Sequence, residues 1–207
     1  MSLAPAQSGE RRIGVFGGAF DPPHAAHVAL VCAAVADLKL DELRVIPTGH
    51  AWHKARPLSP AHHRLAMAQL AFGELPRVVV DDRETRRTGP SYTVDTLREL
   101  RAQWPDAELF VLLGEDQARA LPSWRAWQEI LRLAIIYVAE RGDWTGTKPR
   151  FVAPKLYESR FRRLQMPAMP VSATDIRARI AAHQSPSPLV FEPVARYIDH
   201  HHLYQTA

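Results

Sequence analysis

Two histidines, His24 and His27, follow a pair of glycines in the stretch of sequence best suited to chemistry. Residues 13–27 read IGVFGGAFDPPHAAH. Glycines let the backbone turn sharply and approach a ligand closely. Asp21 is a favourable helix N-cap and Pro22 a favourable first helical residue. The pattern therefore predicts a helix that begins here and carries both imidazoles on one face.

This arrangement favours a phosphate ligand. A helix N-terminus attracts anions through its dipole and its free amides, but Pro22 and Pro23 remove two of those amides. Two stacked imidazoles and the turn at 17–20 could supply the missing donors. A P-loop is not indicated, because its phosphate-binding lysine does not follow these glycines.

Two other interpretations of the histidine pair remain open. Histidines on one helix face can hold zinc, but the metalloprotease pattern needs a spacing of four with a glutamate between, and this segment has neither. Both histidines could also be ordinary surface residues of a helix. Their shared face, directly after a Gly-Gly turn, favours the phosphate site.

The rest of the chain alternates between short strand-like runs and longer helical patterns. Strands are predicted at 12–16, 42–47, 77–81, 109–114 and 134–139, and helices at 24–38, 60–72, 93–103, 124–131, 175–182 and 193–199. Ser59 is the expected cap of the second helix. Such alternation predicts an α/β fold with a mainly parallel sheet. In these sheets ligands bind beyond the carboxyl ends of the strands, where the strand order reverses.

Length and composition limit the organisation of the chain. The 207 residues, with 46% hydrophobic and 23% charged residues, fit one ordinary globular domain. We expect residues 1–10 to be a loose leader and 11–207 one domain, with a small helical part from about 171 to 207. Residues 142–170, rich in prolines and mixed charge, are expected to form a mobile loop or a strand pair.

Cysteine usage and hydropathy bear on the compartment. The single cysteine, Cys32, excludes a disulfide framework within one chain, and its apolar surroundings predict a buried structural thiol. No segment is typical of a signal peptide or reaches the roughly 18 apolar residues of a membrane span. We therefore expect a cytoplasmic protein.

Five ordered blocks resemble a known family. Residues 17–27 resemble the Gly-Gly-x-Phe-Asp-Pro-x-His-x-x-His signature of nucleotidyltransferases that transfer adenylyl or cytidylyl groups. The four later blocks are similar to segments of nicotinate-mononucleotide adenylyltransferases: GPSYTVDTL at 89–97, LLGEDQARALPSW at 112–124, VSATDIR at 171–177 and YIDHHHLY at 197–204. The resemblance implies a Rossmann-like, doubly wound sheet with helices on both faces. It also implies adenylyl transfer from ATP to nicotinate mononucleotide, which gives deamido-NAD and pyrophosphate in NAD biosynthesis.

The resemblance assigns roles to individual residues. The catalytic, electrostatic role falls to His24, His27 and Arg177. The ATP-binding residues would be Gly17, Gly18, Ala19, Phe20, Gly114, Asp116, Ser172 and Thr174. The nicotinate mononucleotide would be bound by Ser91, Tyr92, Thr93 and Trp124, and, on a looser match, by His53 and Lys54.

The residues themselves agree with these roles but leave alternatives open. Ser91, Tyr92 and Thr93 precede a predicted helix, so they could receive a carboxylate or merely cap the helix. The indole of Trp124 could support a flat ring or pack in the core. The fork of Arg177 suits phosphate oxygens, although a solvated helix arginine is the plain alternative.

Some positions depart from the family pattern. Ala26 stands where many relatives have glycine, and Ala19 where many have threonine. Both are small, so close approach to a nucleotide is kept. The RGDW sequence at 141–144 lacks the proline of the family's usual turn, so we expect a loop of different shape there.

The expected partners are ATP and nicotinate mononucleotide, with Mg²⁺ arriving on ATP and no metal site built from protein side chains. No nucleic acid or membrane partner is expected, and the chain would be a monomer or homodimer. Nicotinamide mononucleotide and pantetheine phosphate are alternative acceptors. A more distant alternative, compatible with the net charge of +4, is a basic RNA- or DNA-binding module at 141–163 that uses Phe151, Tyr157 and Phe161.

Overall fold

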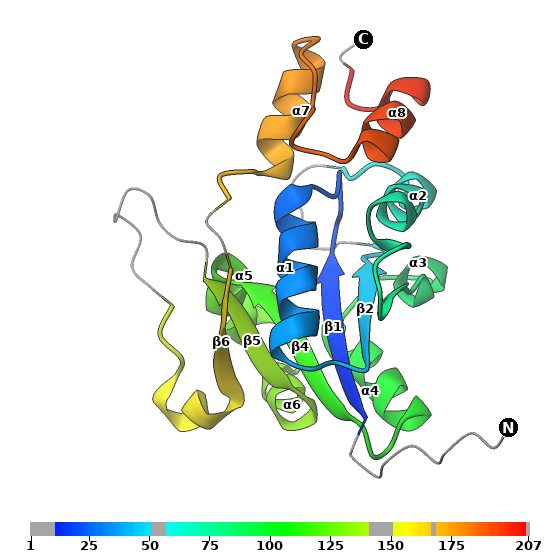
Figure 1. The fold of residues 1–207 in the computed structure, drawn as a ribbon. Helices are drawn as coiled ribbons and strands as arrows, with labels where there is room; N and C mark the ends of the chain where they lie inside the picture. Colours follow the sequence, from blue (N-terminus) through cyan, green and yellow to red (C-terminus); the bar gives the residue numbers. More distant parts are fainter. Residues whose placement is uncertain (1–10, 51–56, 141–150, 167–168, 206–207) are drawn as a thin grey trace, which may run out of the picture.

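The computed structural model describes residues 11–50, 57–140, 151–166 and 169–205 (Figure 1). In these ranges all neighbouring strands of one sheet run parallel, in the order β3-β2-β1-β4-β5-β6. The strands are β1 (Arg12–Gly18), β2 (Glu42–Pro47), β3 (Val78–Val80), β4 (Glu108–Gly114), β5 (Ile135–Glu140) and β6 (Phe161–Gln165). The order reverses between β1 and β4, which confirms the predicted doubly wound α/β fold and places its switch point beside the glycine turn.

Helices connect the strands and extend beyond them. The longer helices are α1 (Ala25–Asp37), α2 (Ala61–Phe72), α4 (Thr93–Gln103), α6 (Trp127–Leu133), α7 (Ala173–Ala181) and α8 (Glu192–His200). The short ones are α3 (Arg83–Arg86), α5 (Glu115–Ala120), η1 (Leu121–Ser123) and η2 (Lys155–Arg160). Figure 1 shows α1 on one face of the sheet and α7 and α8 beyond the carboxyl ends of β1 and β2. None of the helices in the described ranges is long and apolar enough to cross a membrane.

Two hydrophobic clusters hold helices to the two faces of the sheet. Alternate residues of β1 point to opposite faces, so Val15 belongs to one cluster and Phe16 to the other. The Phe16 cluster contains residues of α1, α2, α7 and α8, including Val31, Met67, Ile176 and Ile198. The Val15 cluster contains residues of α4, α5 and α6, including Leu97, Ala118 and Ile130. Helices therefore cover both faces, as expected.

The structure corrects several local predictions. The helix expected at 124–131 lies at 127–133 and follows α5 and η1, so Trp124 lies in a connection. Pro60, and not Ser59, occupies the N-cap of α2. The described part of 142–170 contains η2 and the parallel edge strand β6 in place of a loop or strand pair. Cys32 is exposed on the solvent side of α1, so the prediction of a buried thiol is wrong.

Candidate active site

The glycine turn at the end of β1 is shaped by an aromatic ring. Phe20 is 2% exposed and has a left-handed backbone with φ of 49°. A Cβ atom added to Gly18 would lie 3.0 Å from the Phe20 ring, which is tight enough to favour glycine there. The same ring contacts His27 edge-on, with centroids 5.3 Å apart. The turn and the histidine pair are thus packed as one unit.

The two histidines are stacked. Their ring centroids are 3.7 Å apart and their planes differ by 22°, which confirms the predicted stacked imidazoles. Helix α1 begins at Ala25, and His24 is its N-cap residue. The backbone amide of His24 donates to Nδ1 of His27 at 3.3 Å. Since Nδ1 accepts this bond, the neutral His27 ring carries its proton on Nε2, where it can donate to a ligand.

Asp21 is not the helix cap that its local sequence predicts. It is 2% exposed, and its carboxylate accepts hydrogen bonds from the Tyr204 hydroxyl at 2.6 Å and the Ser59 amide at 3.3 Å. The local capping signal is overridden because both oxygens are bonded to segments distant in sequence. Asp21 belongs to residues 17–24, which we call the phosphate loop after the ligand expected there. It connects this loop to the start of α2 and to the C-terminal turn.

Helix α7 brings Arg177 to the same loop. Its guanidinium donates to the Asp21 carbonyl at 2.8 Å and to the Thr174 hydroxyl at 3.1 Å. Ser172 is the N-cap of α7, and its hydroxyl oxygen accepts from the Asp175 amide at 3.1 Å. The fold therefore places the late VSATDIR block beside the histidine turn, although the two are far apart in the chain.

A buried arginine that the sequence reasoning missed connects the loops after β1 and β2. Arg64 of α2 is 1% exposed, and burial lowers its pKa. It donates to four backbone carbonyls: Ser59 at 2.8 Å, Ala19 at 3.0 Å, Thr48 at 2.6 Å and Gly49 at 3.0 Å. Its spacing from Met67, Ala68 and Ala71 places a charged residue on the apolar face of a helix, and that was the available signal.

The GPSYTVDTL block lies against the loop after β2. Ser91 is 8% exposed; its hydroxyl oxygen accepts from the Gly49 amide at 3.2 Å, and its own amide donates to the His50 carbonyl at 3.1 Å. Tyr92 is the N-cap residue of α4, and Thr93 begins the helix. Buried Glu84 accepts from the Thr96 hydroxyl at 2.7 Å, and its burial raises its pKa. Glu84 is a second buried polar group that the sequence reasoning missed.

Trp124 lies close to this block. The indole is partly buried and packs against the cluster that contains Val15. The guanidinium of the next residue, Arg125, lies 4.7 Å from the centre of the Tyr92 ring. The two segments expected to bind a pyridine ring are therefore neighbours, at the carboxyl edge of the sheet.

The remaining predicted residues are placed as follows. Gly114 ends β4 and is the N-cap residue of α5. Strand β4 lies next to β1 in the sheet. Asp116 is exposed and accepts from Arg119 at 3.2 Å. His53 and Lys54 lie outside the described residues, as does the RGDW loop at 141–144.

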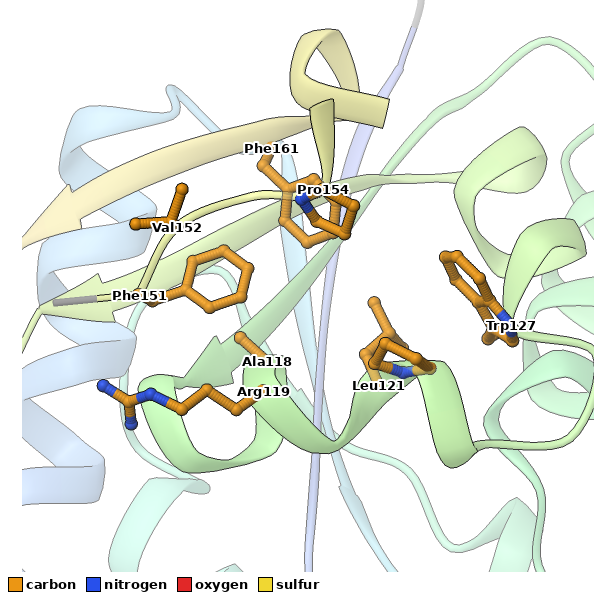
Figure 2. A pocket seen from close by; sticks show the side chains of 9 residues that line it. Ala118, Arg119, Leu121, Trp127, Phe151, Val152, Pro154 and Phe161 are labelled. Carbon is orange, nitrogen blue, oxygen red and sulfur yellow. The ribbon is translucent and has the colours of Figure 1, made fainter. Parts of the chain in front are cut away.

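A separate cavity of about 300 Å³ lies beside α5 and η1 (Figure 2). None of the residues predicted to bind ATP or nicotinate mononucleotide lines it. Its walls are Ala118, Arg119, Leu121, Pro122, Trp127, Phe151, Val152, Pro154 and Phe161. The Phe151 and Phe161 rings are 5.4 Å apart, and Tyr157 packs edge-on against Trp127 at 5.1 Å. These three aromatics belong to or pack against the cluster that contains Val15, whereas the nucleic-acid alternative needs them as exposed platforms.

Comparison with known proteins identifies relatives over nearly the whole chain. Residues 15–179 match the family model described as cytidylyltransferase-like. A probable nicotinate-nucleotide adenylyltransferase of Albidiferax ferrireducens is 72% identical over 95% of this chain and 100% of that protein. A like-named protein of Methylibium petroleiphilum is 44% identical over 95% of this chain and 94% of its own length.

A solved structure shares the fold. It is the nicotinic acid mononucleotide adenylyltransferase of Plasmodium falciparum complexed with NaAD, with a TM-score of 0.76 and 19% sequence identity. The match covers 94% of this chain and 98% of that chain.

Proposed function

The chain belongs to the cytidylyltransferase-like family and, within it, to the nicotinate-nucleotide adenylyltransferases, and from this we propose the reaction that it catalyses. The reaction is transfer of the adenylyl group of ATP to nicotinate mononucleotide, forming deamido-NAD and pyrophosphate in NAD biosynthesis. The observation that carries the proposal is the stacked pair His24 and His27, with Arg177 bonded to the Asp21 carbonyl of the same loop.

The proposed chemistry is an in-line displacement. A phosphate oxygen of the mononucleotide attacks the α-phosphorus of ATP, and the bond to the bridging oxygen breaks as pyrophosphate leaves with the electron pair. The attacking oxygen is already ionised, so no general base is needed. Positioning and charge stabilisation then supply the rate enhancement. His24, His27 and Arg177 would stabilise the negative charge on the phosphates, with Nε2 of His27 as one donor.

The remaining ATP contacts follow from the placement of the loops. Gly17, Gly18, Ala19 and Phe20 form the turn over which the nucleotide would pass. Ser172 and Thr174 lie at the N-terminus of α7, where amides and the helix dipole favour a triphosphate. Gly114, which ends β4, and Asp116, in the first turn of α5, would contact the adenosine hydroxyls.

The acceptor would lie between α4 and the connection that contains Trp124. The N-terminal amides of α4, at Tyr92 and Thr93, favour a carboxylate, and this supports nicotinate over nicotinamide. Ser91 would fix that turn through its bonds to the loop after β2. Trp124 would support the pyridine ring, and His53 and Lys54 would contact the mononucleotide phosphate.

We propose that Mg²⁺ arrives as part of the ATP substrate. Proteins commonly bind Mg²⁺ through substrate phosphates and retained waters. The groups gathered at the loop, two imidazoles and a guanidinium, suit phosphate oxygens better than a hard cation. Among the described residues no group of three or more His, Cys, Asp or Glu could hold a metal ion. The carboxylate of Asp21, in the same loop, already accepts from Tyr204 and Ser59.

The organisation and setting of the chain also stay proposals. We propose that residues 11–207 act as one nucleotidyltransferase domain, supported by the shared hydrophobic cluster of α1, α2, α7 and α8. The expectations of a cytoplasmic location, a monomer or homodimer, and no nucleic-acid partner remain predictions.

Initial rates of pyrophosphate release test the proposal directly. With ATP and Mg²⁺, kcat/KM should be far higher for nicotinate mononucleotide than for nicotinamide mononucleotide or pantetheine phosphate. A preference for the amide would keep the reaction class but remove the proposed carboxylate contact. Release with none of these acceptors, from folded protein, would contradict the proposed function.

A variant of Trp124 tests the acceptor site separately. Loss of a stacking platform should raise KM for the mononucleotide by about tenfold or more in Trp124→Ala, since such stacking contributes about 1–3 kcal/mol. The KM for ATP should change little. Trp124→Phe, which keeps a flat ring, should recover most of the affinity. A wild-type KM for the mononucleotide in Trp124→Ala would remove Trp124 from the site.

A further inference from the structure

The turn that follows α8 returns to the phosphate loop. Tyr204 has a left-handed backbone with φ of 64°, a conformation that side-chain-bearing residues adopt when their surroundings hold them there. Its hydroxyl donates to Oδ1 of Asp21 at 2.6 Å, across 183 residues of sequence, and lies 3.9 Å from Sδ of Met67. The hydroxyl is therefore held at one place beside the loop.

Asp21 also contacts, or lies next to, the groups proposed to act on phosphate. Its carbonyl accepts from Arg177 at 2.8 Å, and its other carboxylate oxygen accepts from the Ser59 amide at 3.3 Å. His24, the N-cap of α1, follows three residues later. A shift of Asp21 would thus move both the guanidinium of Arg177 and the residue that stacks on His27.

The surroundings of Tyr204 and Asp21 keep the tyrosine hydroxyl protonated. Burial and the negative charge of Asp21 raise the pKa of the Tyr204 hydroxyl, so it stays protonated and donates. Arg64 is buried nearby, but its four hydrogen bonds described above all go to backbone carbonyls and none to the Asp21 carboxylate. The tyrosine hydroxyl thus serves as a hydrogen-bond donor to the Asp21 carboxylate.

We propose that Tyr204, acting through Asp21, is a positioning residue for adenylyl transfer: it sets the place of Arg177 and of the His24 turn relative to the reacting phosphates. This inference rests on the proposed function and adds a residue that lies outside the proposed substrate contacts. Small displacements of groups that stabilise a transition state cost rate more than affinity. Tyr204 therefore acts on kcat.

The chain offers a matched control for this residue. Tyr197, in α8, is also partly buried, and its hydroxyl makes one hydrogen bond of 3.0 Å, to Nδ1 of His63. It lies in the same C-terminal segment and makes no contact with Asp21 among those described. Tyr197→Phe therefore removes the same atom from the same region without touching the phosphate loop.

The first experiment compares Tyr204→Phe with Tyr197→Phe. We expect kcat to fall about 10- to 100-fold in Tyr204→Phe, with both KM values changed less than about threefold, while Tyr197→Phe keeps the wild-type kcat. Urea denaturation checks that both variants are folded at the assay temperature. Equal kcat values for the two variants would overturn the proposal.

A double-mutant cycle separates positioning from general stability. In an Arg177→Ala background, Tyr204→Phe should lower kcat by a smaller factor than in the wild type, because one of the two groups that it positions has gone. An equal loss with and without Arg177 would overturn the proposal. If Tyr204→Phe does not fold, Asp21→Asn, which cannot accept with both side-chain atoms, is measured in the same way.

Failure of the proposed function would be recognised separately. It would appear as absence of turnover in the wild-type protein. Without turnover there is no transfer for Tyr204 to position, so the positioning proposal falls with the proposed function. With turnover in the wild type, the comparison of Tyr204→Phe with Tyr197→Phe tests the positioning alone, and equal kcat values overturn it.

Discussion

The backbone amide of His24 donates to Nδ1 of His27, and the two rings stack with centroids 3.7 Å apart. The hydrogen bond fixes the tautomer of His27, and the stack fixes the orientation of both rings. Phe20 and Phe16 contact the His27 ring, with centroids 5.3 and 5.8 Å away. The pair is therefore organised before any nucleotide binds, as charge stabilisation in a transition state requires.

Removal of either imidazole should mainly slow the chemical step. We expect His24→Ala and His27→Ala each to lower kcat by about 10² to 10³, by analogy with the loss of one oxyanion donor. Steady-state pyrophosphate release measures the effect. His62→Ala, at an exposed position of α2, is the control and should keep wild-type kcat. Full activity in both site variants would contradict their assignment.

Arg64 should be a main determinant of stability. Arg64→Met would keep most of the side-chain volume but leave four carbonyls without their donor. Each buried polar group left unsatisfied costs about 1–3 kcal/mol, so we expect the free energy of unfolding to fall by at least about 3 kcal/mol. Urea denaturation provides the measurement.

The control for Arg64 is an arginine at the surface. Arg196→Met removes an exposed ion pair with Glu192, and the expected change is less than about 1 kcal/mol. Similar losses in the two variants would mean that the buried bonds of Arg64 add little to stability.

Gly49 should not tolerate a side chain. A Cβ atom there would lie 2.0 Å from the Glu84 carbonyl oxygen, so backbone would have to move. We expect Gly49→Ala to lower the free energy of unfolding by about 1–3 kcal/mol. Gly17→Ala, where no atom lies within 4 Å of the added Cβ, should be neutral or slightly stabilising. Thermal or urea unfolding of the two variants decides between them.

The histidines between α2 and α8 should make stability depend on pH. Burial lowers the pKa of His63, and the neighbouring His62 and His201 lower it further, from an ordinary value of 6.5. The unfolded chain therefore binds a proton more readily than the folded one. The contribution to stability is complete above about pH 6.5 and is lost as pH falls through the folded pKa of His63.

Urea unfolding between about pH 7.5 and 5 tests this dependence. His63→Gln should lose stability less steeply on acidification than the wild type. His183→Asn, an exposed histidine outside this cluster, should keep the wild-type profile. A His63→Gln curve parallel to the wild type would exclude this histidine as the source.

Local sequence patterns predicted the parts of the fold that depend on local contacts. Apolar runs predicted five of the strands. Four of these (β1, β2, β4 and β5) lie inside the sheet, and β3, although at its edge and with Val79 39% exposed, consists of three valines. Strand β6 was missed, because at the sheet edge Arg162 and Arg163 are exposed and the FRRLQ segment lacks a clear apolar pattern. The burial of Cys32 was predicted wrongly because the whole segment around it is apolar, and such a segment does not reveal which face of α1 meets the sheet.

In the candidate site too, local contacts could be predicted from the sequence and long-range contacts could not. The spacing of His24 and His27 predicted their stacking, since residues three apart on a helix are neighbours. Asp21 was read as a helix cap because its sequence neighbours support that role. Its actual partner, Tyr204, lies 183 residues away, and no local pattern could identify it. The bonds of Arg64 to the loops after β1 and β2 could not be predicted from local patterns either.

The distance in sequence between Asp21 and Tyr204 also has a consequence for biosynthesis. Asp21 is synthesised 183 residues before the hydroxyl that it accepts from, so this bond forms among the last of the fold. Long-range contacts of this kind carry a loop-closure cost before they contribute stability. While the chain is still growing, the phosphate loop lacks this contact to its C-terminal turn. The loop proposed to bind the nucleotide therefore gains its last support only after Tyr204 has been synthesised.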